Sequence, residues 1–123
     1  MEFFQETVYP DLTLDRLRAL LTIRNLPTLC ESISTVISDE NQRGEIYSIW
    51  GQFRISREEI ICGVRFSLLD CPHAFAWTIT YHAENQRLVV HCTIDKQQHE
   101  QDFIDSIHDF TRNWLNGLLK HLS

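Results

Sequence analysis

The spacing of hydrophobic residues changes twice along this chain, from helical to alternating and back to helical. Between about residues 45 and 95, apolar and polar residues alternate in four runs, which is typical of strands with one buried face. On either side of these runs, apolar residues recur every three or four positions, as they do in amphipathic helices. The pattern therefore predicts an α+β fold with a four-stranded antiparallel meander between helices.

The alternation divides each expected strand into an inward and an outward set. The inward sets, which we expect to form the core, are Tyr47, Ile49, Gly51, Phe53 and Ile55, then Ile60, Cys62, Val64, Phe66 and Leu68, then Phe75, Trp77, Ile79 and Tyr81, and finally Leu88, Val90, Cys92 and Ile94. A two-residue turn at Arg57-Glu58 would set Ile55 opposite Ile60 and keep both inward sets on one side of the sheet.

The segment before the meander predicts a strand followed by two helices. Residues 2 to 9 are rich in β-prone side chains and stop at Pro10, so we expect a short edge strand there. Three leucines at helical spacing then predict a helix over about residues 12–24, which ends before Pro27. A second short helix is expected because apolar residues return to helical spacing at Leu29, Ile33, Val36 and Ile37.

The carboxy-terminal segment predicts a long helix that packs on one face of the sheet. Asp95 and Gln98 have the spacing of a capping box at a helix start. An apolar stripe follows at spacings of three and four, formed by Phe103, Ile107, Phe110, Trp114 and Leu118. Because such a stripe must be buried somewhere, we expect it to cover the inward face of the meander.

Composition indicates one globular domain over residues 1–123. Hydrophobic residues make up 43% of the chain and charged residues 23%, with only four glycines and three prolines, which is not a disordered composition. A chain of this length forms one core. The order of elements resembles that of helix-grip folds and of small secretion-chaperone-like α+β folds, and this resemblance implies an architecture and no function.

Charge and cysteine content narrow the expected partners and compartment. The net charge of −6, with no run of Lys or Arg, argues against nucleic acids and anionic membranes as partners. No segment reaches the roughly 18 apolar residues of a membrane span, and the amino terminus does not resemble a signal peptide. We therefore expect a cytoplasmic protein whose four cysteines are reduced core thiols.

Searching for catalytic and metal-binding motifs gives little. The chain has no nucleophile elbow, Gly-rich phosphate loop, zinc-protease helix or EF-hand loop. It has six histidines, but His91 and Cys92 are adjacent and so point to opposite faces of a strand. Cys71 and His73 are the only close pair on an expected loop, and no second pair lies near them in sequence. On this spacing we predict no metal, no cofactor and no catalytic residue.

The outward face of the meander carries the candidate binding residues, which are Trp50, Arg54, Arg65, Thr78, Thr80, His82 and His91. In the expected register, Trp50 lies opposite Arg65, where the guanidinium can stack on the indole, and Thr78 lies opposite His91. Trp and Arg are enriched where binding energy concentrates. An ordinary solvated sheet face is the other interpretation, and the sequence leaves open whether the first helices cover this face.

Two functions stay open at this point. The first is a non-enzymatic protein-binding module, of the immunity, inhibitor or chaperone kind, that uses the outer sheet face and binds a protein partner or a second copy of itself. The second is a small-ligand-binding protein or simple enzyme with a cavity between sheet and helices, which would use His91, His82 or Cys71 with Arg65. An enclosed pocket that gathers those side chains would favour the second function.

Overall fold

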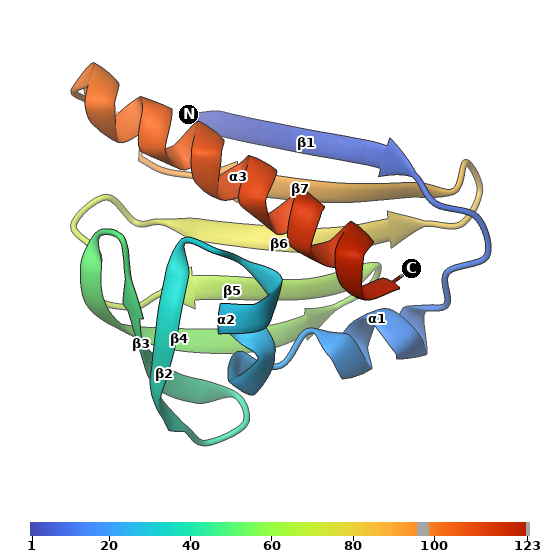
Figure 1. The fold of residues 1–123 in the computed structure, drawn as a ribbon, viewed down its shortest axis with the longest axis horizontal. Helices are drawn as coiled ribbons and strands as arrows, with labels where there is room; N and C mark the ends of the chain where they lie inside the picture. The colour runs from blue at the N-terminus through green and yellow to red at the C-terminus, as the bar shows by residue number, and fades with distance from the viewer. Residues whose placement is uncertain (96–98, 123) are drawn as a thin grey trace.

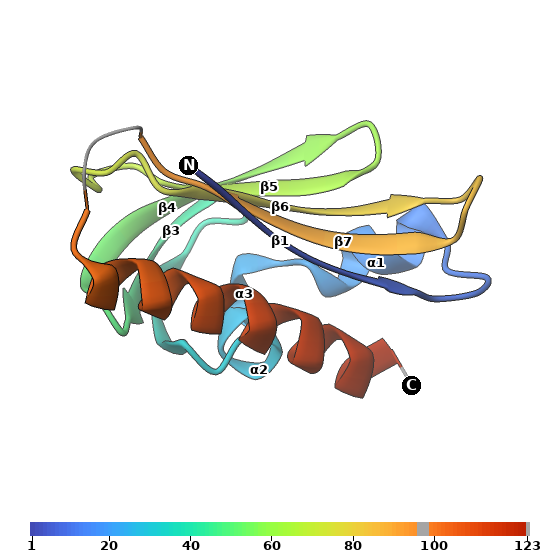
Figure 2. The same cartoon turned by 90° about the horizontal axis from the view of Figure 1, so that it is seen from above.

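The computed structural model describes residues 1–95 and 99–122, which form a curved sheet with helices on its concave face (Figures 1 and 2). The sheet has seven antiparallel strands in the order β1-β7-β6-β5-β4-β3-β2. The strands are β1 (Glu2–Val8), β2 (Ile33–Asp39), β3 (Arg43–Ser48), β4 (Gly51–Ile60), β5 (Gly63–Leu68), β6 (Ala76–His82) and β7 (Arg87–Thr93). The predicted α+β class is confirmed, and the predicted four-stranded meander covers only part of the sheet.

The helices are α1 (Leu14–Leu20), the 3-10 turn η1 (Ile23–Asn25), α2 (Leu26–Leu29) and α3 (Gln101–Leu122). The Thr13 hydroxyl caps α1 by accepting a hydrogen bond from the Arg16 backbone N–H at 3.2 Å. The first predicted helix is divided into α1 and η1. Both lie on the core side of the sheet and not over its outer face. The predicted capping box includes Gln98, which lies outside the described residues.

The second predicted helix is wrong from Ile33 onward, because this segment forms strand β2 and pairs with β3. The residues from Ile33 to Ile37 include four β-branched side chains, which favour extended backbone. Their helical spacing does not mark one buried face, because Ile33 is buried, Val36 is half-buried and Ile37 is 49% exposed. β2 is an edge strand, as is β1 on the other side of the sheet.

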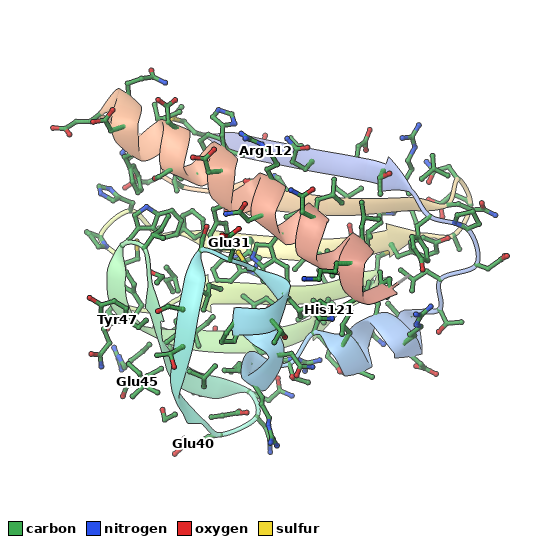
Figure 3. All side chains as sticks on the ribbon, viewed as in Figure 1. Glu31, Glu40, Glu45, Tyr47, Arg112 and His121 are labelled. Atoms are coloured by element: carbon green, nitrogen blue, oxygen red, sulfur yellow. The ribbon has the colours of Figure 1, made fainter. Side chains whose placement is uncertain are left out.

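The first two strands of the predicted meander begin and end at other residues than expected, because the turns lie elsewhere. The chain turns at Ile49-Trp50 and again at Ile61-Cys62, whereas the sequence pattern placed a turn at Arg57-Glu58. Tyr47 and Ile49, expected in the core, are 51% and 55% exposed, and Figure 3 shows Tyr47 at the outer edge. Ile46 is buried in their place.

Polar contacts at Ser48 explain the first turn. The Ser48 hydroxyl accepts a hydrogen bond from the Trp50 backbone N–H at 3.2 Å and donates one to the Gly51 carbonyl at 3.0 Å. Gly51 has a φ of +113°, a conformation that side chains disfavour. Gly51 therefore follows a turn instead of continuing a strand, and the turn moves Trp50 off the sheet face.

The core between sheet and α3 is largely aromatic. Trp77 and Phe110 meet edge to face with ring centroids 5.0 Å apart, and Phe66 stacks on Trp114 at 6.0 Å. The predicted stripe on α3 and the inward sets of β6 and β7 are confirmed, with Phe103 only half-buried. Although α3 is long, no helix in the described ranges is apolar enough to cross a membrane.

A buried arginine joins the sheet to the end of α1. Arg57 lies inside β4, on the core face, and is 8% exposed. Its guanidinium donates to the carbonyl oxygens of Leu21 at 2.5 Å and Arg18 at 3.1 Å. These carbonyls lie at the carboxy-terminal end of α1, where backbone acceptors lack helical partners and a cation is favourable. Arg57 therefore fixes α1 against β4.

Candidate binding pocket

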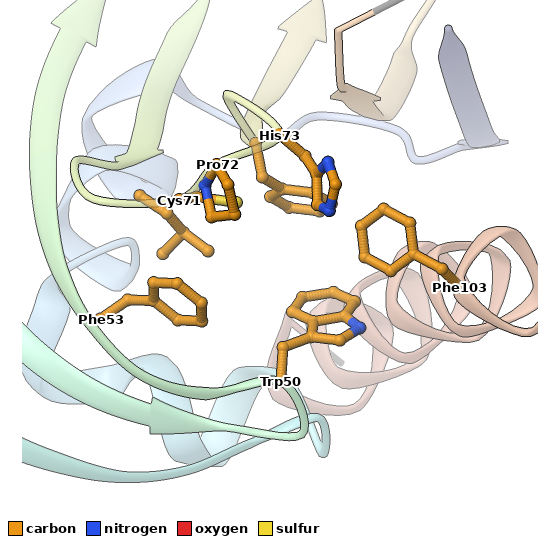
Figure 4. A pocket seen from close by; sticks show the side chains of 8 residues that line it. Trp50, Phe53, Cys71, Pro72, His73 and Phe103 are labelled. Carbon is orange, nitrogen blue, oxygen red and sulfur yellow. The ribbon is translucent and has the colours of Figure 1, made fainter. Parts of the chain in front are cut away.

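A cavity of about 270 Å³ opens where three segments meet at one end of α3 (Figure 4). These segments are the β3–β4 turn, the loop between β5 and β6, and the first turn of α3. The residues that line the cavity are Trp50, Phe53, Leu68, Cys71, Pro72, His73, Phe75 and Phe103. The walls are mostly aromatic and aliphatic, and among the described residues that line the cavity only Trp50, Cys71 and His73 have polar side-chain atoms.

Trp50 forms one wall and is held from two sides. Its ring lies against Phe75 and Phe110, with centroid separations of 5.0 and 5.1 Å. Its indole Nε1–H donates a hydrogen bond to the Ser106 hydroxyl at 2.9 Å. Since the polar atom of the indole already has a partner on α3, the ring presents an apolar surface to the cavity.

The β5–β6 loop forms the opposite wall. The His73 ring packs on Phe103 at 4.8 Å, and Figure 4 shows both rings beside the cavity. The Asp95 backbone N–H donates to the His73 carbonyl at 3.0 Å, which ties the loop to the end of β7. Cys71 is a half-buried free thiol. Within residues 1–95 and 99–122, no histidine makes a hydrogen bond to the Cys71 thiol.

Two other cysteines are placed too deep to act as nucleophiles. Cys30 and Cys92 are free and fully buried, and burial raises the pKa of each thiol to about 12. Cys92 Sγ accepts a hydrogen bond from the Thr111 hydroxyl at 3.3 Å, which only partly offsets the cost of burying a thiolate. Both thiols stay protonated near neutral pH, as expected for core cysteines.

The candidate residues predicted on the outer sheet face are only partly brought together. Thr78 pairs with both Arg65 and His91, so the predicted Thr78–His91 pair is confirmed. Trp50 is absent from this face because it lines the cavity, and the predicted pair with Arg65 is wrong: Arg65 lies opposite Glu58. The remaining members, Arg54, Thr80 and His82, point outward from β4 and β6.

Most of these outward side chains already have local partners. Arg54 forms an ion pair with Asp70 at 3.5 Å. His82 contacts the Thr80 hydroxyl at 3.1 Å. His91 stacks on Phe4 with ring centroids 4.2 Å apart and lies 3.0 Å from a Glu2 carboxylate oxygen. The indentation beside Arg65, Thr78 and His91 measures about 80 Å³, which is too small for an organic ligand.

The sequence did not indicate the pocket, although it identified several of its residues. Phe53, Leu68, Phe75 and Phe103 were expected in the solid core, and Cys71 and His73 were considered as a pair. The missed signal was the Ser48 to Gly51 segment, whose turn chemistry moves Trp50 over the end of α3.

Comparison with known proteins supports the fold and leaves the function open. No known protein family matches the sequence, and no curated protein matches it. The structure is similar to the crystal structure of an uncharacterised protein from Bacillus thuringiensis, with a TM-score of 0.65 and 14% sequence identity. The match covers 96% of each chain. At this identity the likeness shows a shared fold and nothing about the ligand.

Proposed function

We propose that the protein binds a small, largely apolar molecule in the cavity between the sheet and α3. The observation that carries the proposal is an open cavity with aromatic walls and few polar atoms. Ligand sites are usually concave, mainly apolar, and supplied with a small number of placed polar groups. Here His73 and the Cys71 thiol take that part, and the hydrogen bond from Trp50 to Ser106 holds the opposite wall in position.

The cavity favours a compact, flat ligand. Its 270 Å³ lies just below the usual range of about 300–1,000 Å³ for small-molecule sites. The rings of Trp50, Phe75 and Phe103 present surfaces on which an aromatic or alicyclic group can stack. We therefore propose a ligand of one or two fused rings with at most a few polar atoms.

A substitution that fills the cavity tests the proposal. Indole and naphthalene fragments would be titrated against the 15N-labelled protein, and their contacts followed by amide shifts around Trp50 and Phe103. The variant Cys71→Phe should weaken fragment binding at least tenfold, because the new ring occupies the cavity. Cys62→Phe is the matched control, since Cys62 lies in the β4–β5 turn away from the cavity. Equal binding by wild type and Cys71→Phe would remove the proposal.

A second candidate function is the docking of a protein on the outer sheet face. Phe4 supports it, because this ring is 58% exposed and lies on His91 beside Arg65 and Thr78. A chemically crosslinked partner that is lost from both Arg65→Ala and His91→Ala, and kept by Lys120→Ala, would support this role. The cytoplasmic location and the homodimer expected from the sequence remain predictions.

A further inference from the structure

Three side chains of types that can bind metal ions, from two loops, meet beside the pocket. His73 comes from the β5–β6 loop, and Asp95 and His99 come from the segment between β7 and α3. One nitrogen or oxygen atom from each side chain lies within 4.8 Å of the other two. The His73 and His99 rings meet edge to face with centroids 4.9 Å apart.

The three residues are half-buried, and some of their polar atoms are buried and unpaired. The His99 side chain is 2% exposed. His73 Nδ1 and Asp95 Oδ1 are buried and have no hydrogen-bond partner among the residues that the structure describes. Asp95 Oδ1 lies 3.1 Å from His99 Nε2, but this nitrogen donates its hydrogen bond to the Asp95 backbone carbonyl oxygen at 3.3 Å, a bond that an ion bound at Nε2 would replace. Unpaired buried polar atoms are costly and require an explanation.

A local ion pair does not explain the whole cluster. Asp95 and His99 are four residues apart, and their approach alone could be a contact at the start of α3. That interpretation leaves His73 Nδ1 buried without a hydrogen-bond partner in residues 1–95 and 99–122. The packing of the two imidazoles against each other and against Phe103 is favourable in itself, but ring packing supplies no hydrogen bond to that nitrogen.

We propose that His73, Asp95 and His99 bind one divalent transition-metal ion of the zinc class. Two imidazoles and one carboxylate are ligands that zinc, cobalt and nickel accept, whereas magnesium and calcium prefer oxygen ligands only. Two ligands about 2.1 Å from a tetrahedral ion are themselves about 3.4 Å apart. The 3.1 Å between Asp95 and His99 is close to that spacing.

The neighbouring packing would support such an ion. His73 and His99 both lie against Phe103, at 4.8 and 5.4 Å, and this ring limits the directions in which the imidazoles can turn. The backbone hydrogen bond from Asp95 to His73 holds the two loops together at 3.0 Å. Three protein ligands leave a fourth position for water or another small ligand. The metal site rests on these contacts and not on the proposed ligand in the pocket.

Cobalt titration tests the site. The protein, without a polyhistidine tag and treated with EDTA, would be titrated with Co²⁺ while visible absorption is recorded, and with Zn²⁺ by calorimetry. We expect one Co²⁺ ion to bind per chain. Its visible absorption bands should be those of cobalt with a low coordination number. His73→Gln and Asp95→Asn should each weaken binding at least tenfold. His82→Gln is the matched control, since His82 lies on the outer face, and its affinity should stay within twofold of wild type.

Two further measurements distinguish a loss of metal binding from a loss of folding in the variants. Far-UV circular dichroism and the thermal midpoint of each metal-free variant would show whether it folds, and Asp95→Asn preserves the shape of the side chain if His73→Gln does not. In the wild type, Zn²⁺ should raise the thermal midpoint, because an ion that binds only the folded state stabilises it. Cobalt binding that is absent in the wild type, or equal in wild type and in folded His73→Gln and Asp95→Asn, would overturn the proposal.

Discussion

The indole Nε1–H of Trp50 donates a hydrogen bond to the Ser106 hydroxyl at 2.9 Å, and this contact joins the β3–β4 turn to α3. Ser106 in turn donates to the Phe103 carbonyl at 2.6 Å, within the first turns of the helix. The pocket wall on the sheet side is thus connected to the wall on the helix side by two consecutive hydrogen bonds.

Removing either partner of this contact should cost stability. Trp50→Phe keeps most of the ring packing but loses the donor, and Ser106→Ala loses the acceptor. We expect each to lower the free energy of unfolding by about 1 kcal/mol, as is usual for one hydrogen bond. Urea unfolding of both single variants and the double variant measures this, and the double variant should lose less than the sum. Strict additivity would mean that the two groups do not interact.

Replacing the buried arginine should be more severe. Arg57→Met removes the guanidinium that satisfies the Leu21 and Arg18 carbonyl oxygens at the end of α1. We expect a loss of about 3 kcal/mol, because buried acceptors are left without donors. Arg54→Met is the matched control on the same strand, and its exposed ion pair with Asp70 predicts a change below about 0.5 kcal/mol. Similar unfolding midpoints for the two variants would contradict the assigned role of Arg57.

A methyl group at position 117 should separate two helices. A Cβ on Gly117 would overlap the Leu29 carbonyl oxygen, so α3 could not approach α2 as closely as it does. In an exposed helix, Gly→Ala stabilises by about 1 kcal/mol, but here we expect Gly117→Ala to destabilise by about 2 kcal/mol. Asn116→Ala, on the exposed side of α3, should be neutral or stabilising. Thermal unfolding of both variants gives the sign directly.

The four thiols should fall into two reactivity classes. At pH 8 a thiol reagent should modify Cys62 and Cys71 quickly, because both are partly accessible. Cys30 and Cys92 should react only when the protein unfolds, since burial raises the pKa of each to about 12. Counting modified thiols with time, with and without denaturant, measures the two classes. Rapid modification of all four in the native protein would contradict the buried positions.

The same two thiols predict a loss of stability at high pH. The pKa of each thiol is raised on folding, from about 9.0 in the unfolded chain to about 12. The contribution of such a thiol to stability is present in full below pH 9 and is lost as the pH rises from 9 to 12. Each thiol should then lower the free energy of unfolding by about 1.4 kcal/mol per pH unit in that range. The decline between pH 9 and 10 in urea unfolding should be smaller in Cys30→Ala and Cys92→Ala than in wild type. An unchanged slope would exclude these thiols as its source.

The sequence predicted the parts of the fold in which one pattern continues without a competing signal. The alternation through β6 and β7 and the stripe on α3 are long, so the inward residues of these two strands and the stripe from Ile107 to Leu118 were placed correctly in the core. β2 was mistaken for a helix because Ile33, Val36 and Ile37 have a helical spacing in the sequence, although Ile37 is exposed at the edge of the sheet. A strand was expected to continue through Gly51, because the alternation of apolar and polar residues is not interrupted there. The turn depends on the Ser48 hydroxyl, which leaves no mark in that alternation.

The pocket and the His73–Asp95–His99 cluster could not be predicted in this way. Their residues belong to three separate segments, and they meet only because β5, β6 and β7 pair and α3 packs across them. His73 and His99 belong to loops on which the hydrophobic pattern carries no information. Sequence spacing identified Cys71 and His73 as the nearest pair, whereas the fold brings His73 to Asp95 and His99 instead.

The pairing of β1 with β7 joins the first strand of the chain to the last one. Phe3 lies opposite Cys92, so this part of the core can form only after both distant segments have been synthesised. Contacts between residues so far apart in sequence slow folding, because a long loop must close before they form. Until β1 pairs with β7, the backbone N–H and C=O groups along one edge of β7 can pair with another chain. From the order of strands we therefore expect the closing of this edge to be a late folding event, during which newly made chains are exposed to pairing with one another.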